Sequence, residues 1–206
     1  VMNKGRGVNQ VTIVIYVDDI LISAKNQCDI DRLIGELKTE YREVKTTDQT
    51  DFSYLGMLIS ATHGRVEVSM QAYTEGVLAE NEVSGSVTTP ATGNLFKIGD
   101  SPRLAVRDAE KFHTTVAKLL YLAKRTRPDI LLSVAFLTTR VKEPTQEDRN
   151  KLARVLKYLN GNCGRKLIFR PSTASGVIGY VDASFGLHDD GRSHTGLIVT
   201  LYGCNV

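Results

Sequence analysis

The stretch from Val11 to Ala24 places two adjacent carboxylates, Asp18 and Asp19, inside an otherwise apolar and β-branched run. Residues of this kind on both sides favour a β-hairpin with Val17, Asp18 and Asp19 at or beside its turn. Two neighbouring carboxylates repel each other unless a cation lies between them, and Mg²⁺ prefers oxygen ligands. The stretch therefore indicates a metal site at a hairpin tip. A solvated acidic turn is the alternative, because Asp is common in turns.

Length and composition set wider limits. The 206 residues can hold one large domain or two small ones, and 42% hydrophobic residues are enough for a packed core. Three cysteines without C-x-x-C spacing indicate neither a disulfide framework nor a thiolate metal site, which favours a reducing, intracellular setting. The longest apolar run, residues 130–137, is far shorter than the roughly 18 residues that span a bilayer. The polar first ten residues do not resemble a signal peptide, so we expect no membrane partner.

Basic residues are concentrated in one part of the chain. Residues 111–170 contain 14 Lys and Arg against 4 Asp and Glu, whereas residues 1–110 contain 11 against 16. Such a concentration suggests a surface that faces a polyanion, because each neutralised phosphate releases counterions. A solvated helical face is the alternative. Lys151, Arg154 and Lys157 recur three residues apart and are candidates for phosphate contacts.

Hydrophobic periodicity predicts both helices and strands. Helical spacing predicts helices over residues 29–44, 71–83, 109–125 and 128–140, and Pro128 suits a first helical turn. Thr145 and Asp148 resemble a capping box that opens a further helix, which Gly161 would end. Residues 84–102, rich in Gly, Ser, Thr and Pro, form a linker. Strands are predicted over residues 52–60, 65–70, 166–170, 177–185 and 195–202, with a new sheet beginning after Arg165.

Several segments together resemble one protein family. Tyr16-Val17-Asp18-Asp19 between hydrophobic strands resembles the palm motif of reverse transcriptases, and residues 54–59 resemble the primer-grip hairpin that follows it. Three later segments are similar to the polymerase-to-nuclease stretch of copia-type LTR retrotransposons: residues 119–123, 126–130 and 155–161. Residues 179–183 and 192–196 resemble the opening of their ribonuclease H domain. The segments follow in the family's order over nearly the whole chain.

The resemblance implies an α+β fold in four parts. These are the C-terminal part of a polymerase palm (1–70), a small thumb and linker (71–110), a basic helical connection (111–164) and the start of a ribonuclease H-like sheet (165–206). The implied activity is RNA-directed DNA polymerisation, in which a primer 3′-hydroxyl attacks a deoxynucleoside triphosphate with the help of two metal ions. The metal would be Mg²⁺, with Mn²⁺ as a substitute.

The resemblance also implies partners and a location. The partners would be RNA and DNA as a primer-template duplex, a deoxynucleoside triphosphate and the rest of the polyprotein, with a dimer as an open option. The location would be cytoplasmic, in virus-like particles, with the nucleus as a second option.

Roles follow for individual residues. Asp18 and Asp19 would be catalytic metal ligands, and Asp182 would be the first metal ligand of the nuclease site. Asp182 lies in an apolar strand, where an unpaired carboxylate would be costly. Asp189 and Asp190 are expected to be turn residues. Lys45 is a candidate to protonate the departing pyrophosphate, or an ordinary favourable charge at a helix C-terminus. The residues implied to contact primer or template, besides the three basic ones, are Tyr16, Val17, Tyr54, Leu55 and Gly56.

The catalytic set implied by the family is incomplete in this sequence. The family has a further Asp upstream of the hairpin that no residue here matches, and residues 191–206 contain no Asp or Glu. We therefore expect the isolated chain to polymerise poorly or not at all. Two other functions stay open: a catalytically idle nucleic-acid-binding module derived from a retroelement, and a metal-dependent phosphotransferase or hydrolase that uses the Asp pair without a template.

Overall fold

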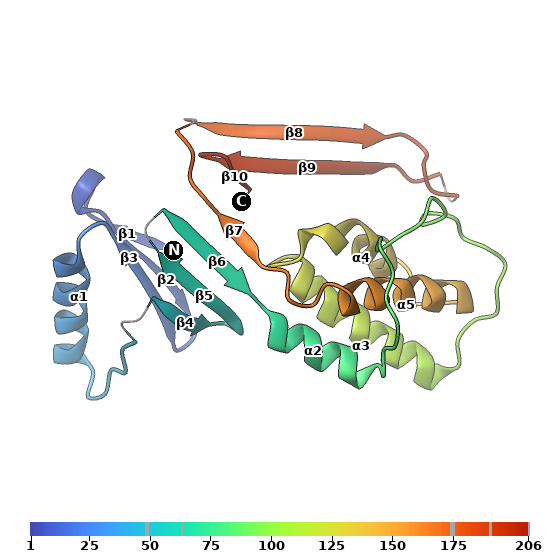
Figure 1. Cartoon of the computed structure of the whole chain (residues 1–206), viewed down its shortest axis with the longest axis horizontal. Helices are drawn as coiled ribbons and strands as arrows, with labels where there is room; N and C mark the ends of the chain where they lie inside the picture. Colours follow the sequence, from blue (N-terminus) through green and yellow to red (C-terminus); the bar gives the residue numbers. More distant parts are fainter. Residues whose placement is uncertain (48–49, 63, 174–175, 190, 206) are drawn as a thin grey trace. The chain divides into compact units, whose positions relative to one another are not determined.

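The computed structural model describes residues 1–47, 50–62, 64–173, 176–189 and 191–205 (Figure 1). The described chain is mixed α and β, which confirms the α+β prediction at this level. It divides into two compact units, residues 1–59 and 60–206. The strand orders of the sheets are β1-β2-β3, β4-β5-β6-β7 and β10-β9-β8.

The first unit is built on the β-hairpin that the sequence predicts. Its strands pair antiparallel from Val11 opposite Ala24 to Tyr16 opposite Asp19. The helix predicted over 29–44 is confirmed but ends at Glu40, because Tyr41 is extended. The elements of this hairpin region are β1 (Met2–Lys4), η1 (Gly7–Asn9), β2 (Val11–Tyr16), β3 (Asp19–Ala24) and α1 (Gln27–Glu40).

A second tight turn lies between β4 (Asp51–Tyr54) and β5 (Met57–Thr62). Leu55 and Gly56 have φ values of 50° and 73°. Positive φ at both central residues is the signature of a type I′ turn, which reverses an antiparallel pair. The prediction of one continuous strand over 52–60 is therefore wrong. Gly adopts this backbone without steric cost, whereas Leu does so rarely.

The helices of the second unit form its apolar core. They are α2 (Gln71–Glu80), α3 (Val106–Ala123), η2 (Pro128–Ile130), α4 (Leu131–Thr138) and α5 (Gln146–Asn160). The helices predicted near 71–83, 109–125 and 128–140 are confirmed, although the last one opens as a 3₁₀ turn at Pro128. No helix in the described part of the chain is long and apolar enough to cross a membrane. Core residues that are at most 2% exposed include Phe112, Val116, Leu119, Leu122, Ile130, Val134, Phe136, Leu137, Val155 and Leu159.

Both ends of α5 lie where the sequence predicts them, but the backbone at its C-terminal end differs from the usual glycine cap. The Thr145 side chain accepts a hydrogen bond from the Asp148 amide, and the Asp148 carboxylate accepts one from the Thr145 amide at 2.9 Å. This reciprocal pair confirms the predicted capping box. Gly161 ends the helix as predicted, but with a φ of −74° rather than in the left-handed region.

The strands of the second unit correct one prediction. β6 (Arg65–Ser69) pairs antiparallel with β7 (Leu167–Phe169), with Val66 opposite Phe169. β7 therefore completes an earlier sheet and does not begin a new one after Arg165. The new sheet consists of β8 (Val177–Ser184), β9 (His194–Leu201) and β10 (Cys204–Asn205).

A buried charge joins several of these elements. Arg127 is only 2% exposed. Its guanidinium donates to both carboxylate oxygens of Asp129, at 3.0 and 2.8 Å, and to the Asn162 carbonyl oxygen at 2.9 Å. The Tyr158 hydroxyl donates to the same carboxylate at 2.8 Å. Burial alone would raise the pKa of Asp129, but the hydrogen bonds from Arg127 and Tyr158 outweigh it and hold that pKa below its ordinary value.

Replacing Arg127 by Met should lower the free energy of unfolding by about 3–5 kcal/mol, because it removes the main partner of the Asp129 carboxylate, whose side chain is 27% exposed, and the donor to the Asn162 carbonyl oxygen. Arg165 lies 3.8 Å from Asp129 with an exposed side chain, so Arg165→Ala should cost no more than about 1 kcal/mol. Urea denaturation followed by circular dichroism near pH 7 measures both.

The same pair predicts a pH dependence. The Asp129 pKa is lowered on folding, so its stabilising contribution is present above its ordinary pKa of 3.8 and is lost as pH falls below that value. The wild type should therefore lose more stability than Arg127→Met on acidification below 3.8. Equal losses in the wild type and the variant, or a cost of Arg127→Met below about 1 kcal/mol at pH 7, would show that Arg127 does not stabilise the fold through Asp129.

Candidate functional site

The β2–β3 hairpin turns tightly at Val17 and Asp18. Tyr16 pairs with Asp19, so two residues connect the strands. Val17 has a φ of 52°, an outlier for a β-branched residue because its Cβ crowds the backbone there. Val17 is 80% exposed, and Tyr16 is 59% exposed. The paired strands thus hold a strained turn in contact with solvent.

Asp18 and Asp19 lie at this turn, and both are exposed. Neither carboxylate makes a hydrogen bond or an ion pair with any described residue of the chain. Their oxygens are hard ligands of the kind that Mg²⁺ prefers, so the pair fits a divalent cation as two of its ligands. Within the described ranges, no group of three or more His, Cys, Asp or Glu lies close enough to hold a metal ion.

The other tight turn of the first unit holds the residues predicted to grip a primer. Tyr54 is 8% exposed, and its hydroxyl is buried without a hydrogen-bond partner among the described residues. Leu55 is half-buried, and Gly56 is exposed. Leu55 and Gly56 are therefore turn residues, whereas Tyr54 is a core residue.

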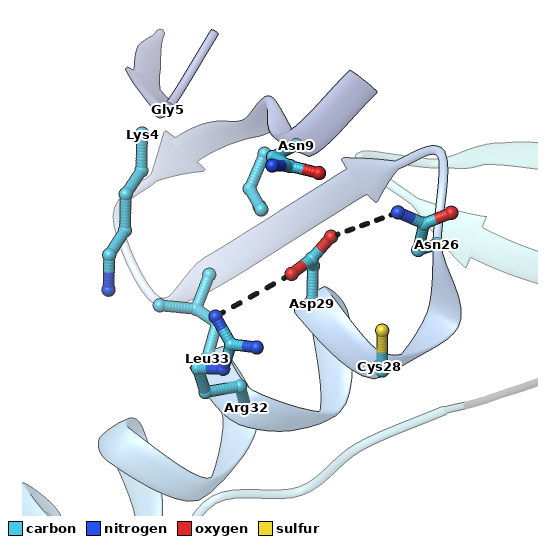
Figure 2. A pocket seen from close by; sticks show the side chains of 9 residues that line it. Lys4, Gly5, Asn9, Asn26, Cys28, Asp29, Arg32 and Leu33 are labelled. Atoms are coloured by element: carbon cyan, nitrogen blue, oxygen red, sulfur yellow. Dashed lines mark hydrogen bonds and ion pairs between the residues drawn. The ribbon is translucent and has the colours of Figure 1, made fainter. Parts of the chain in front are cut away.

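A pocket in the first unit lies where η1 and the start of α1 face each other (Figure 2). Asp29 in the first turn of α1 accepts a hydrogen bond from the Asn26 side chain at 3.4 Å and lies 3.7 Å from the Arg32 guanidinium. The Asp29 carboxylate thus partly neutralises the charge of Arg32 in the pocket. None of the predicted site residues lines it.

Lys45 lies beyond α1, with its side chain 91% exposed and 3.5 Å from Glu43. It is therefore not part of the helix C-terminus, because α1 ends at Glu40. No described contact brings it to the Asp pair, and its proposed role as a general acid stays a prediction.

Asp182 lies in β8 opposite Gly196, and every residue of β8 is exposed. The argument that burial makes an unpaired carboxylate costly at this position is therefore wrong. Its role as a nuclease ligand stays a prediction. Asp189 accepts a hydrogen bond from the Ile98 amide at 2.6 Å, which fastens the β8–β9 connection to the linker. Asp190 lies outside the described residues.

The basic residues predicted on α5 have partners of their own. Lys151 pairs with Glu147 at 3.2 Å and donates to the Lys97 carbonyl oxygen. Arg154 donates to the Thr89 hydroxyl at 2.9 Å. These contacts fasten α5 to the linker, whereas Lys157 is exposed. Their role as phosphate contacts stays a prediction.

The excess of positive charge in residues 111–170 is smaller in the folded chain than in the sequence, because acidic residues from other segments lie beside its cations. Lys118 pairs with Glu80, Arg149 with Asp108 and Lys166 with Glu67, and all three acidic partners lie outside residues 111–170. A further row of polar side chains along α3 was not singled out from the sequence: Arg107, Lys111, Thr114, Lys118, Tyr121 and Arg125. Its spacing of three and four residues is the signal that could have found it.

Comparison with known proteins identifies relatives. No protein-family model and no solved structure matches the chain. It is 29% identical over 199 residues to a putative transposon Ty5-1 protein of Saccharomyces cerevisiae, covering 95% of this chain and 64% of that protein. It is 30% identical over 212 residues to a retrovirus-related Pol polyprotein from transposon TNT 1-94 of Nicotiana tabacum, covering 95% of this chain and 15% of that protein. The chain is related to a region of retrotransposon polyproteins.

A third relative has no established role. An uncharacterized mitochondrial protein of Arabidopsis thaliana is 29% identical over 197 residues, covering 94% of this chain and 80% of that protein. The chain therefore spans from 15% to 80% of the length of these relatives. The similarity extends over both units, because each alignment covers at least 94% of the chain.

Val17→Gly should strengthen the hairpin, because it removes a Cβ from the left-handed region at a turn. The readout is hydrogen exchange of the Val14 and Leu21 amides, which form the next hydrogen-bonded pair behind Tyr16 and Asp19. We expect exchange up to about fivefold slower, which corresponds to about 1 kcal/mol of relieved strain.

The matched control is Ile13→Gly, which places the same residue type inside strand β2, opposite Ile22. Gly is unfavourable in a strand interior, because it has more backbone freedom to lose and no side chain to pack, so this variant should speed exchange. Faster exchange in both variants would contradict strain at Val17.

Proposed function

We propose that the chain is part of a reverse transcriptase, in which the β2–β3 hairpin supplies two metal ligands for RNA-directed DNA synthesis. The observation that carries this proposal is the pair of exposed carboxylates, Asp18 and Asp19, at a two-residue turn. Relatives named as retrovirus-related Pol polyproteins support the class of enzyme.

The chemistry requires a cation that several carboxylates hold, and the hairpin provides two of them. Mg²⁺, or Mn²⁺ as a substitute, would stabilise the negative charge of the attacking and leaving oxygens when bound. Asp18 and Asp19 would hold the cation, while Tyr16 and Val17 offer exposed surface to a primer terminus. The substrates under this proposal are a primer-template duplex of RNA and DNA and a deoxynucleoside triphosphate.

The nuclease part of the proposal concerns Asp182. Its position in the exposed strand β8 leaves the carboxylate accessible to a cation and a substrate. Residues 179–183 and 192–196, which carry the resemblance to ribonuclease H, lie on the paired strands β8 and β9 or in the connection between them.

A second function is a nucleic-acid-binding module without catalysis. The unpredicted row of cations on α3 favours it, because such a row can bind phosphates without a metal ion. The two functions differ in whether the Asp pair binds a divalent cation.

Mn²⁺ added to the isotope-labelled full chain should broaden the amide signals of residues 16–20 first, because paramagnetic broadening falls steeply with distance from the ion. Asp18→Asn combined with Asp19→Asn should abolish this broadening, and excess Mg²⁺ should compete with it. Glu40→Gln combined with Glu43→Gln removes two exposed carboxylates of the same unit and should leave it unchanged. Broadening that survives in the Asp variant would rule out the metal role of the pair.

Primer extension on an RNA template separates the two functions. Incorporation that Asp18→Asn abolishes, with duplex binding retained, would support the polymerase. Duplex binding without incorporation, and without Mn²⁺ broadening at residues 16–20, would support the idle module.

A further inference from the structure

One side of α3 carries a row of polar side chains that contains no acidic residue. Its members are three or four positions apart, so they follow one another along one face of the helix. We call this row the α3 cationic stripe. It consists of Arg107, Lys111, Thr114, Lys118, Tyr121 and Arg125.

The stripe is long and lies away from the core. At 1.5 Å per residue, positions 107 to 125 span about 27 Å. Arg125 lies just beyond the last helical residue, and its amide still bonds the Leu122 carbonyl oxygen. Arg107, Lys111 and Thr114 are exposed, whereas the core residues Phe112, Val116 and Leu119 occupy another face.

The second half of the stripe is held in place by aromatic rings. The Arg125 guanidinium lies 3.5 Å from the centre of the Tyr121 ring and donates to the Tyr121 carbonyl oxygen at 3.3 Å. On the neighbouring helix α2, the Tyr73 ring lies 5.4 Å from that of Tyr121, and its hydroxyl donates to the Lys118 carbonyl oxygen at 3.3 Å. A guanidinium fixed in this way loses less conformational entropy when it binds a phosphate.

We infer that the α3 cationic stripe binds the phosphate backbone of a nucleic-acid duplex. Four cations in a row complement a polyanion whose strands each carry one charge per 3.4 Å, and about 27 Å matches roughly eight base pairs. One exposed carboxylate, Glu110, lies beside Arg107 and Thr114 at the start of the row. The hydroxyl of Thr114 can donate to phosphate oxygens, as such side chains commonly do. The inference rests on the proposed function for the class of ligand, but it needs no metal ion.

One cation of the stripe is partly neutralised. Lys118 forms an ion pair with Glu80 of α2. A phosphate that binds Lys118 has to compete with this carboxylate, so Glu80 weakens binding at the centre of the stripe. This contact gives the inference a test in which binding should become stronger.

The first test removes two exposed cations, in Arg107→Gln combined with Lys111→Gln. Fluorescence anisotropy follows the binding of the full chain to a DNA duplex and to an RNA–DNA hybrid of about 20 base pairs over a range of salt concentrations, without divalent cations. The slope of log K against log salt should become shallower by about two. One phosphate contact contributes a factor of about eight to the change in the binding constant between 0.1 and 1 M salt. The loss of two contacts should therefore weaken binding at 0.1 M by about 60-fold, if binding at 1 M stays the same.

The matched control is Lys142→Gln combined with Arg170→Gln, which removes one Lys and one Arg at exposed positions outside the stripe. It should leave the slope within experimental error, and circular dichroism should show native helix content in both double variants. Equal losses in the two variants would overturn the inference in favour of a general charge effect. Equal affinity for polyglutamate, with the same dependence on Arg107 and Lys111, would overturn it in favour of an acidic protein partner.

The second test releases Lys118. Glu80→Gln should tighten duplex binding by up to about eightfold at 0.1 M salt, whereas Glu75→Gln on the same helix should have a much smaller effect. Equal changes in these two variants would show that Lys118 does not contact the duplex. Both tests measure duplex binding without divalent cations, so failure of the metal site and failure of the stripe are distinguishable.

Discussion

Arg127 carries a permanent charge at a position where water reaches almost none of it, so its donors must find acceptors within the protein. Asp129 and the Asn162 carbonyl oxygen meet this requirement, and Tyr158 completes the carboxylate's partners. The contacts join η2, α5 and the segment after α5. The Arg127 amide also bonds the Leu122 carbonyl oxygen near the end of α3. The contacts of Arg127 therefore fix the direction in which the chain leaves α3. They also fix the position of Arg125, which ends the α3 cationic stripe two residues earlier.

The sequence predicts best those features that depend on neighbouring residues. The β2–β3 hairpin follows from the run of apolar, β-branched residues on both sides of its turn, and the capping box of α5 follows from Thr145 and Asp148 three positions apart. The tight turn at Leu55 and Gly56 was missed because Leu is unusual at positive φ, although the Gly was a visible signal. The pairing of β7 with β6 could not be predicted locally, because about 100 residues separate Val66 from Phe169.

In the candidate site, too, local features could be predicted from the sequence and contacts between distant residues could not. The exposed position of Asp18 and Asp19 follows from the turn itself. Counts of charge by segment could not show which cations have acidic partners, because Glu80 and Glu67 come from other parts of the chain to pair with Lys118 and Lys166. The spacing of Lys151 and Arg154 could not show that both side chains contact the linker, because that linker lies more than 50 residues earlier in the chain. Charge periodicity identifies a helix face, but only packing decides whether that face is open.

β8 forms the outer edge of its sheet, and all eight of its residues are exposed. It contains neither Pro nor Lys, which commonly protect such edges from pairing with other strands. Val177 and Val181 are each about 70% exposed, so the strand offers apolar side chains together with unpaired backbone groups. In concentrated solution this edge favours aggregation by strand addition. A single Lys substituted for an exposed apolar residue of β8 should therefore make the purified chain more soluble without altering its helical core.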